Sequence, residues 1–244
     1  MYVLITGASS GIGEELARLF SNDGYDLIIV ARNKNKLDKL AKKLKNNVLV
    51  KSFDLSDIKQ CYLLFEEIKG LDIAYFINNA GFGNLGFFSE TDIEIENNML
   101  QLNINAVHTL TKLFIQNYEH GDVVNISSLA AFVPTPTFAT YAASKSYVYY
   151  LSRAINYELK KQKRNNRVLT VIPGPVKTNF NTRAKAKVNR GMDVKKCAFI
   201  IFKGIKKRKD LIIPGFFMKI TYLLIKFIPT KLLLKSSYRI QTRK

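Results

Sequence analysis

Six short apolar runs, separated by segments with a helical pattern, constrain the fold of this chain most strongly. Between the runs, apolar residues recur every three or four positions, as at Ile12, Leu16 and Leu19. Strands that are apolar on both faces and alternate with helices are typical of a parallel sheet covered on both sides. The pattern therefore predicts an α/β fold with a doubly wound parallel sheet. The predicted strands are Tyr2–Ile5, Leu27–Ala31, Val48–Phe53, Ile73–Ile77, Val123–Ile126 and Val168–Ile172.

The C-terminal part adds a helix from Asp193, its expected N-cap, to Lys207, and a seventh strand at Leu211–Pro214. The sequence contains no internal repeat and no linker long enough to divide it, so we expect one domain over residues 1–244. A core at 1–178 precedes a loop at about 179–192 and a basic, apolar extension at about 208–244. No apolar run in this extension reaches the roughly 20 residues of a bilayer-spanning helix, whereas an in-plane amphipathic helix fits it.

The net charge of +19 is concentrated in the last quarter of the chain. Residues 183–244 contain 18 basic and 2 acidic residues, whereas residues 1–182 contain 20 and 17. An anionic partner is therefore expected to bind at the C-terminal end. With 47% hydrophobic and 23% charged residues, the chain has the composition of a folded protein and not of a disordered one.

Cysteine and histidine are too scarce for a disulfide framework or a histidine-rich metal centre, and we predict no metal site. The two cysteines, Cys61 and Cys197, are far apart, and His108 and His120 are the only histidines. Met1 already opens the first strand-like run, so we read no secretion signal. We expect an intracellular, reducing compartment, the cytoplasm.

A glycine-rich segment, Thr-Gly-Ala-Ser-Ser-Gly-Ile-Gly at Thr6–Gly13, joins the first strand to the first helix. Gly7 permits the tight turn, Gly11 lets the backbone approach a pyrophosphate, and Gly13 lets the helix pack close to the sheet. The helix N-terminus presents free N–H groups to the anion. A glycine-rich turn can also exist without a ligand, but the position between strand and helix favours a nucleotide site. The expected contacts are Gly7, Ser9, Ser10, Gly11, Ile12 and Gly13.

The spacing G-x3-G-x-G, with its flanking residues, resembles the short-chain dehydrogenase/reductase family, and the resemblance covers residues 1 to about 178. It implies a Rossmann-like fold and a dinucleotide coenzyme. In particular, Asp54 would contact the adenine edge, while the Val176 backbone and the Thr178 side chain would fix the carboxamide of the nicotinamide. The further coenzyme contacts that the resemblance implies are Asp54, Leu55, Asn79, Ala80, Gly81, Pro173, Gly174, Val176 and Thr178, together with Tyr141 and Lys145.

Arg32 ends the second strand, 19 residues past Gly13. A site that prefers NAD has an acidic residue here, which binds the ribose 2′-hydroxyl. A guanidinium can instead hold a 2′-phosphate through two parallel hydrogen bonds, assisted by Ser9 or Ser10. We therefore predict NADP(H) as the cofactor; the alternative is an arginine that is merely solvated.

A Tyr-x3-Lys pair places a phenol and an ammonium on one face of a helix. Three such pairs occur, Tyr141/Lys145, Tyr157/Lys161 and Tyr222/Lys226, so the spacing alone is weak evidence. Only Tyr141 has the strand end Asn125–Ser128 thirteen residues upstream, as the family requires. It is also followed by a strand that ends in a Pro-Gly-x-Val-x-Thr loop. We interpret Tyr157 and Tyr222 as packing residues.

The resemblance implies a catalytic role for three of these residues. Tyr141 would donate a proton in reduction and accept one in oxidation. Lys145 would lower the pKa of this phenol, which is near 10 when free, and bind the nicotinamide ribose. Ser128 would donate a hydrogen bond to the substrate carbonyl oxygen, where negative charge develops. Ser127 is the competing candidate, but the thirteen-residue spacing favours Ser128.

The fourth catalytic residue is an asparagine, for which two positions compete. The family pattern N-x-x-[GA] aligns with Asn103 and Ala106, so Asn103 would hold a water in the proton relay to Lys145. Asn105 is the alternative.

The substrate side is less well defined by the sequence. The turn Gly81–Phe88 predicts an aromatic wall, and the loop Asn179–Met192 is rich in lysine, arginine and asparagine. Together they favour an apolar pocket with a basic rim, suited to a hydrophobic or acidic-headed carbonyl compound.

Three interpretations fit the basic C-terminal extension. It could cover one end of the sheet or a dimer face, it could attach to an anionic membrane, or it could bind nucleic acid. We do not expect nucleic acid, because no known binding module accompanies the charge. Relatives commonly pair through the helices that correspond here to about Leu100–Tyr118 and Tyr141–Lys163, so we also expect a homo-oligomer, a dimer or tetramer.

These predictions combine into one function. We expect an NADP(H)-dependent oxidoreductase that reduces a ketone or aldehyde, or oxidises the matching secondary alcohol, by hydride transfer. The alternative is a non-catalytic coenzyme-binding sensor or scaffold. The intact set Asn103, Ser128, Tyr141 and Lys145 argues against this alternative, because a sensor needs the glycine loop but no proton relay.

Overall fold

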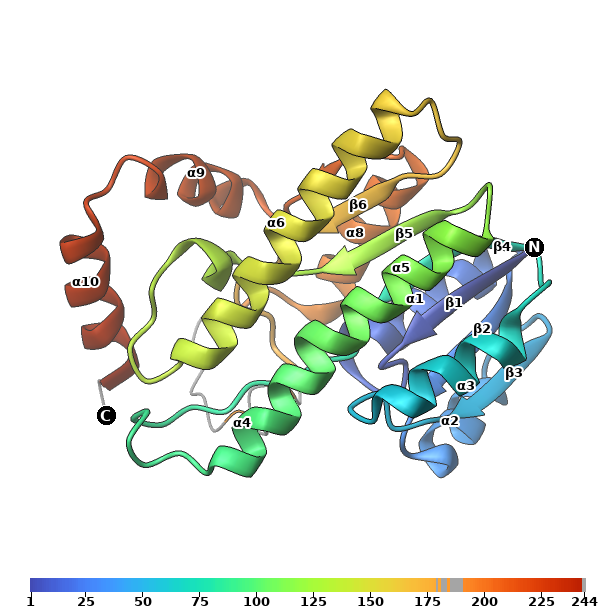
Figure 1. Ribbon diagram of the computed structural model, residues 1–244, viewed down its shortest axis with the longest axis horizontal. Helices are drawn as coiled ribbons and strands as arrows, with labels where there is room; N and C mark the ends of the chain where they lie inside the picture. The colour runs from blue at the N-terminus through green and yellow to red at the C-terminus, as the bar shows by residue number, and fades with distance from the viewer. Residues whose placement is uncertain (179, 181–183, 185–190, 243–244) are drawn as a thin grey trace.

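The centre of the molecule is a seven-stranded parallel sheet, seen in a computed structural model that describes residues 1–178, 180, 184 and 191–242 (Figure 1). The strand order is β3-β2-β1-β4-β5-β6-β7. The predicted doubly wound α/β fold is therefore confirmed, and the seventh strand is present, although it has only two residues. The strands are β1 Tyr2–Thr6, β2 Asp26–Ala31, β3 Val48–Ser52, β4 Ile73–Asn78, β5 Asp122–Ile126, β6 Val168–Val171 and β7 Leu211–Ile212.

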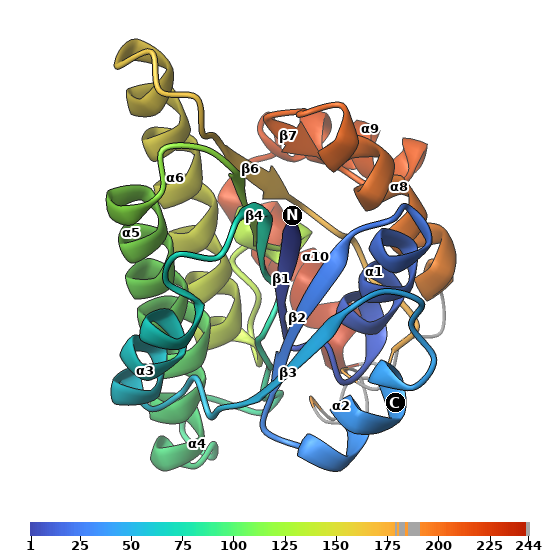
Figure 2. The same ribbon diagram turned by 90° about the vertical axis from the view of Figure 1, so that its right-hand side faces the viewer.

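Helices cover both faces of the sheet (Figure 2). One face carries α1 (Gly11–Asn22), α2 (Lys34–Ala41) and α8 (Val194–Lys206). The other carries α3 (Ile58–Ile68), α5 (Val107–Asn117) and α6 (Ala139–Lys161). The predicted helix N-cap at Asp193 is confirmed, because its side chain accepts a hydrogen bond from the Lys196 N–H at 3.0 Å.

The strands are apolar on both faces because each face packs on a layer of helices. In β1, Val3 and Ile5 face the core formed with α1 and α8, whereas Leu4 faces the core formed with α3, α5 and α6. All three side chains are fully buried. The alternation follows from the two-residue period of a strand, so a continuous apolar run fills two cores at once.

The order of the strands reverses direction between β1 and β4, which opens a crevice at the carboxyl edge of the sheet. In register, Ile5 pairs with Ile77, Asn78 with Asn125, and Ile126 with Val171. The segments that follow these four strands therefore emerge side by side. They include the glycine turn after β1 and the segments that begin at Asn79, Ser127 and Ile172.

The segment predicted as a helix at Leu100–Tyr118 is helical, but it changes its hydrogen-bonding pattern along its length. A π-helical segment η1, Gln101–Ala106, separates α4 (Ile93–Leu100) from α5. Short π-helical insertions are rare and occur often at functional sites. This one contains the predicted site residue Asn103.

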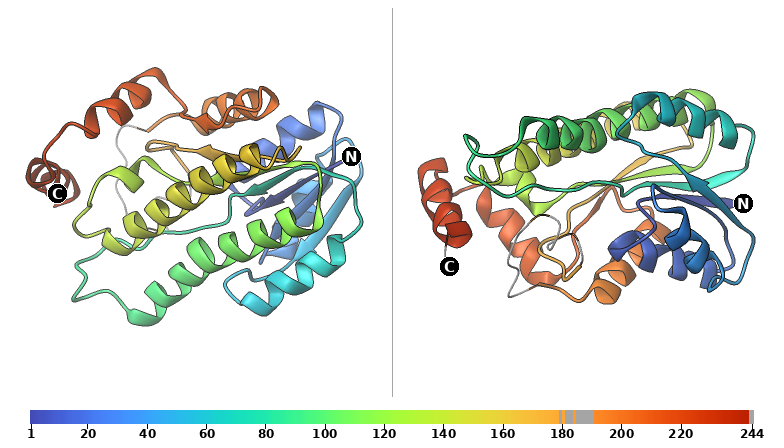
Figure 3. Two further views of the ribbon diagram at one scale, coloured as in Figure 1. Left: turned by 45° about the horizontal axis from the view of Figure 1, so that its top comes forward. Right: turned by 90° about the horizontal axis from the view of Figure 1, so that it is seen from below.

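Two helices at the C-terminus, α9 (Phe216–Ile225) and α10 (Thr230–Thr242), lie beyond the carboxyl ends of the strands (Figures 1 and 3). The inner face of α9 is buried through Tyr222 and Ile225, and Met218 packs beside them. Of the three interpretations of the extension, packing over one end of the fold describes this inner face. Among the described residues, no helix is both long and apolar enough to cross a bilayer.

Candidate active site

A cavity of about 1590 Å³ lies at the carboxyl edge of the sheet, and most of the predicted site residues line it. Two predicted residues do not line it: Gly13 lies beneath the glycine turn, and Asn103 lies behind Phe82. The predicted residues that line the cavity are Gly7, Ser9, Ser10, Gly11, Ile12, Arg32, Asp54, Leu55, Asn79, Ala80, Gly81, Ser128, Tyr141, Lys145, Pro173, Gly174, Val176 and Thr178.

The turn after β1 has no room for side chains at two of its glycines. Gly7 has a φ of +67°, and a Cβ added there would lie 2.9 Å from the Cα of Ala80. A Cβ at Gly13 would lie 2.6 Å from the carbonyl oxygen of Gly7. The Asn79 side chain locks this arrangement, because its Nδ2 donates to the carbonyl oxygens of Thr6 at 3.0 Å and Gly7 at 3.3 Å.

The N-terminus of α1 faces the cavity without a side-chain cap. Four other helices begin with a cap: Asn33, Asp57, Asp92 and Asp193 each accept a hydrogen bond from the first turn of α2, α3, α4 and α8. At α1 the N-cap residue is Ser10, and its side chain makes no such bond. The N–H groups of this turn therefore remain available to bind an anion. The positive end of the α1 dipole lies at the same place and also favours a bound anion.

Two basic residues line the cavity near the end of β2. Arg32 and Lys36 are both exposed, and an Arg32 nitrogen (NH1) lies 3.7 Å from the Asp54 carboxylate. Partial burial acts to raise the pKa of Asp54, but hydrogen bonds from Ser56 and the charge of Arg32 outweigh it and lower that pKa. Lys36 was not predicted from the sequence. It lies in the first turn of α2, whereas Arg32 precedes the N-cap Asn33, so no helical spacing in the sequence links the two.

The Tyr141 phenol lies in an aromatic and mostly apolar environment. Its ring stacks on Phe138 with the ring centroids 4.4 Å apart, and the Phe180 ring lies 5.5 Å away. Burial raises the pKa of Tyr141 to about 12, although a hydrogen bond with the Ser128 side chain acts in the opposite direction. The phenol of the chain on its own is therefore protonated at neutral pH and is a hydrogen-bond donor.

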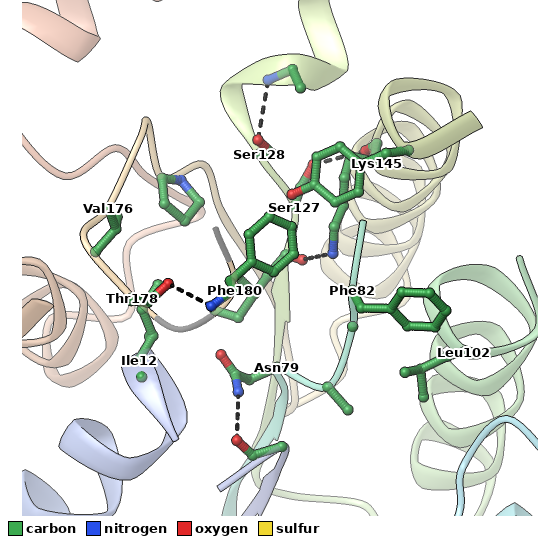
Figure 4. Close-up of a pocket in the computed structure, with 18 of the residues that line it drawn as sticks. Ile12, Asn79, Phe82, Leu102, Ser127, Ser128, Lys145, Val176, Thr178 and Phe180 are labelled. Atoms are coloured by element: carbon green, nitrogen blue, oxygen red, sulfur yellow. Dashed lines mark hydrogen bonds between the residues drawn. The ribbon is translucent and has the colours of Figure 1, made fainter. Parts of the chain in front are cut away.

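Lys145 is also buried, and its ammonium contacts the backbone of β5. Its Nζ donates to the carbonyl oxygen of Ile126 at 3.0 Å and lies 5.8 Å from the centroid of the Tyr141 ring (Figure 4). Burial lowers the pKa of Lys145 to about 8. Burial therefore moves the pKa values of the two side chains in opposite directions. Lys145 is not among the groups that shift the Tyr141 pKa in the chain alone, and its lowering of that pKa beside a bound coenzyme stays a prediction.

The two adjacent serines at the end of β5 have different surroundings. The Ser127 hydroxyl donates to the backbone carbonyl of Lys145 at 2.7 Å, which fixes α6 against β5. The Ser128 hydroxyl accepts from the Ala130 N–H at 3.2 Å and hydrogen-bonds with Tyr141. Both serines line the cavity, but only Ser128 pairs with the phenol.

The two candidate asparagines are on different sides of the helix. Asn103 is fully buried, and its side-chain amide pairs with both backbone groups of Phe82, at 3.1 and 2.9 Å. Its Nδ2 also lies 3.1 Å from the Ser144 hydroxyl. Asn105 is exposed and bonds Gln101 on its own helix. Asn103 therefore positions the chain segment that carries Gly81 and Phe82, and Asn105 is remote from the cavity.

The other two Tyr-x3-Lys pairs lie outside the cavity lining. Tyr222 is buried, and its hydroxyl lies 3.0 Å from that of Tyr149, as expected for a packing residue. The same interpretation of Tyr157 was wrong. Its side chain is 63% exposed, because it lies on the outward face of α6, whereas its neighbours Asn156 and Leu159 are buried, and Lys161 lies over its ring.

The predicted aromatic wall is correct in part. Phe82 and Leu85 line the cavity, but Phe87 and Phe88 do not, and Phe88 is 73% exposed. The tertiary structure supplies other aromatic rings instead, from Phe138 and Phe180. The predicted substrate loop, 179–192, lies mostly outside the described residues. Sequence reasoning also missed one wall of the cavity, which α10 supplies through Ser237, Ile240, Gln241 and Thr242.

The loop predicted to hold the nicotinamide is fixed by backbone hydrogen bonds. The carbonyl oxygen of Pro173 accepts from the Leu129 N–H at 2.9 Å, and Val176 forms an isolated bridge with Met192. The Thr178 hydroxyl accepts from the Phe180 N–H at 3.3 Å, which joins this loop to the aromatic group around Tyr141.

Comparison with known proteins identifies the family. The family model described as short chain dehydrogenase matches residues 1–189. The chain is 34% identical over 173 residues to a very-long-chain 3-oxoacyl-CoA reductase of Neurospora crassa. That alignment covers 66% of this chain and 52% of the reductase. It is 32% identical over 188 residues to a 3-oxoacyl-[acyl-carrier-protein] reductase of Rickettsia conorii, and that alignment covers 75% of this chain and 76% of the reductase.

Among solved structures, a short-chain dehydrogenase from Sphingobium yanoikuyae in complex with NADPH is 29% identical, with a TM-score of 0.84. The alignment covers 100% of this chain and 97% of that one. The chain therefore belongs to the short-chain dehydrogenase/reductase family. It spans about half the length of the 3-oxoacyl-CoA reductases that it matches.

Proposed function

We propose that this protein is an NADPH-dependent reductase of lipophilic carbonyl compounds, with 3-oxoacyl thioesters as the substrate class. Two of the relatives are named for the reduction of 3-oxoacyl groups, and one solved relative is in complex with NADPH. The apolar side of the cavity, with Phe82, Phe138 and Phe180 around Tyr141, fits an acyl chain better than a polar metabolite.

The cavity has groups that suit both phosphate-bearing parts of the proposed coenzyme. The uncapped N-terminus of α1 and the turn at Gly7 would hold the pyrophosphate. Arg32 and Lys36 would hold a 2′-phosphate, which supports NADP(H) over NAD(H). NADPH, when bound, supplies the hydride that reduces the carbonyl carbon.

The residues of the chain supply the proton and stabilise the charge. Tyr141, protonated at neutral pH, donates its proton to the carbonyl oxygen as negative charge develops there. The Ser128 hydroxyl, which bonds the phenol in the free chain, turns to the same oxygen and lowers the energy of the transition state. Lys145, whose pKa is about 8, can pass a proton to the phenol from the buried side.

One observation carries this proposal: Ser128, Tyr141 and Lys145 converge in the same cavity as the glycine turn, although they come from two different elements. A non-catalytic coenzyme sensor would need the glycine turn and Arg32 alone. It would not need a buried lysine and a serine that bonds a buried phenol.

The test is NADPH oxidation with acetoacetyl-CoA, a short 3-oxoacyl thioester. Tyr141→Phe should lower kcat about 100-fold or more, because it removes the general acid. It should leave NADPH affinity, measured by quenching of coenzyme fluorescence, within about twofold of the parent value.

Tyr157→Phe is the matched control, because Tyr157 belongs to a second Tyr-x3-Lys pair on the same helix and is exposed. It should turn over normally. Near-normal activity of Tyr141→Phe would refute the mechanism. Tight NADPH binding by the parent chain without turnover of any ketone, aldehyde or 3-oxoacyl thioester would favour the sensor.

A further inference from the structure

The outer face of α9 carries apolar side chains that no described part of the chain covers. Phe217 is 77% exposed and Phe227, just past the helix, is 85% exposed. Along the helix, Phe216, Ile220, Leu223 and Phe227 follow the 3–4 spacing of a single face, opposite to the buried Tyr222 and Ile225. The helix is thus anchored on one side and bare on the other.

Exposed basic residues flank this apolar face. Lys219 and Lys226 are seven residues apart, so they share one flank of α9. On α10 the exposed basic residues are Lys231, Lys235 and Arg239. No acidic residue occurs from Phe216 to Thr242. Aromatic and aliphatic side chains on one face with lysines at its edge are typical of helices that lie in the interface of an anionic membrane.

We propose that the outer surface of α9 and α10 docks this protein on a membrane that contains anionic phospholipids. Phe217 and Phe227 would insert at the boundary between headgroups and acyl chains, and Lys219 would extend to the phosphates. Lys226, whose ammonium lies 4.4 Å from the centroid of the Tyr222 ring, would turn outward to join it. Charge favours this occupant over a second copy of the chain. Pairing two copies through this surface would bring two acid-free, basic segments together.

The surface proposed to dock also borders the cavity. A role of docking in substrate entry rests on the proposed function. Met218 of α9 packs on Gly174, where an added Cβ would lie within 2.9 Å of the Met218 Cγ. The Ser237 hydroxyl of α10 donates to the carbonyl oxygen of Pro134 at 3.2 Å, and Ile240 lines the cavity while remaining largely exposed. A docked molecule would therefore hold the mouth of its cavity against the bilayer, from which a long-chain acyl substrate could enter.

Sedimentation with vesicles tests the docking without any measurement of activity. The full chain should sediment with phosphatidylcholine vesicles that contain phosphatidylglycerol and bind phosphatidylcholine alone at least about tenfold more weakly. The double variant Phe217→Ser/Phe227→Ser should lose about tenfold or more of the partition coefficient. The variant Lys219→Gln/Lys226→Gln should lose a similar factor of the partition coefficient on anionic vesicles. Added salt should reduce the difference in partition coefficient between this variant and the parent chain.

The matched control is Tyr62→Ser/Leu63→Ser, which removes two large exposed side chains, 52% and 57% exposed, from α3, far from α9 and α10 (Figure 1). It should sediment like the parent chain. Thermal unfolding checks that all variants fold, and the substitutions at 217 and 227 should leave turnover of acetoacetyl-CoA unchanged.

Three results would overturn the docking. The first is absence of the full chain from the vesicle pellet. The second is equal binding of the control and the Phe217→Ser/Phe227→Ser variant. The third is a dimer in analytical ultracentrifugation that the Phe217→Ser/Phe227→Ser variant dissociates, which would assign the face to a second copy. Failure of the proposed function is separate, since Tyr141→Phe should still sediment.

Discussion

Replacing Lys145 with methionine should stabilise the coenzyme-free chain at neutral pH while abolishing turnover. Burial lowers the pKa of Lys145 from 10.5 to about 8. At pH 7 the folded chain therefore carries an ammonium at a cost of about 3 kcal/mol relative to the unfolded chain. The hydrogen bond from Nζ to the Ile126 carbonyl oxygen offsets about 1–2 kcal/mol of this cost. Methionine fills similar space without a charge, so the free energy of unfolding of the variant at pH 7 should exceed that of the parent by about 1–2 kcal/mol.

The pH dependence distinguishes this cause from better packing. Between pH 8 and 10.5 the unfolded chain binds the Lys145 proton more tightly than the folded chain, so the stability of the parent rises with pH. The methionine variant lacks this contribution. The difference in free energy of unfolding between the variant and the parent should therefore shrink by about 1 kcal/mol between pH 7 and pH 9.

Urea unfolding followed by circular dichroism, at several pH values from 6 to 9, measures both quantities. Lys161→Met is the control, because Lys161 is exposed, and it should change the free energy of unfolding by less than about 0.5 kcal/mol. A Lys145→Met variant that is less stable than the parent by 1 kcal/mol or more at pH 7 would refute the argument. So would an advantage that does not change with pH.

Three further substitutions test the site. Ser128→Ala should lower kcat about 100-fold, because it removes a donor to the developing oxyanion. Ser127→Ala should mainly lower the free energy of unfolding, by about 1 kcal/mol in urea, because it removes the hydrogen bond to the Lys145 carbonyl. Equal kinetic effects would contradict the assignment to Ser128. Arg32→Asp should reverse the preference between NADPH and NADH, measured as the ratio of the two dissociation constants; an unchanged ratio would mean that Arg32 does not contact the 2′-phosphate.

Much of the fold could be predicted from the sequence, because its determinants are local. A run such as Leu27–Ala31 is apolar at every position, and only a strand covered on both faces buries all of it. The turn at Gly7 needs a positive φ, and Asp193 caps the helix that follows it. These features predicted the parallel sheet, the start of α1 within the glycine segment and the boundaries of α8.

The site was predictable where the topology determines it. Parallel strands bring their carboxyl ends to one edge, so Asn79, Ser128 and Tyr141 had to approach the glycine turn once the strand order was known. The wrong interpretation of Tyr157 shows the limit of this reasoning. Asn156 and Leu159 are buried beside it, so the exposure of Tyr157 depends on which face of α6 packs against the sheet.

The sequence by itself determined the layered fold, the glycine turn and the choice of Tyr141 among three Tyr-x3-Lys pairs. Only the tertiary structure decided which side chains surround that phenol: Phe138 and Phe180 do, and Phe88 does not. It also decided the opposite changes in the pKa values of Tyr141 and Lys145, and the place of α10 at the cavity. The physical reason is that burial depends on segments far apart in the chain, whereas turns, caps and strand patterns depend on immediate neighbours.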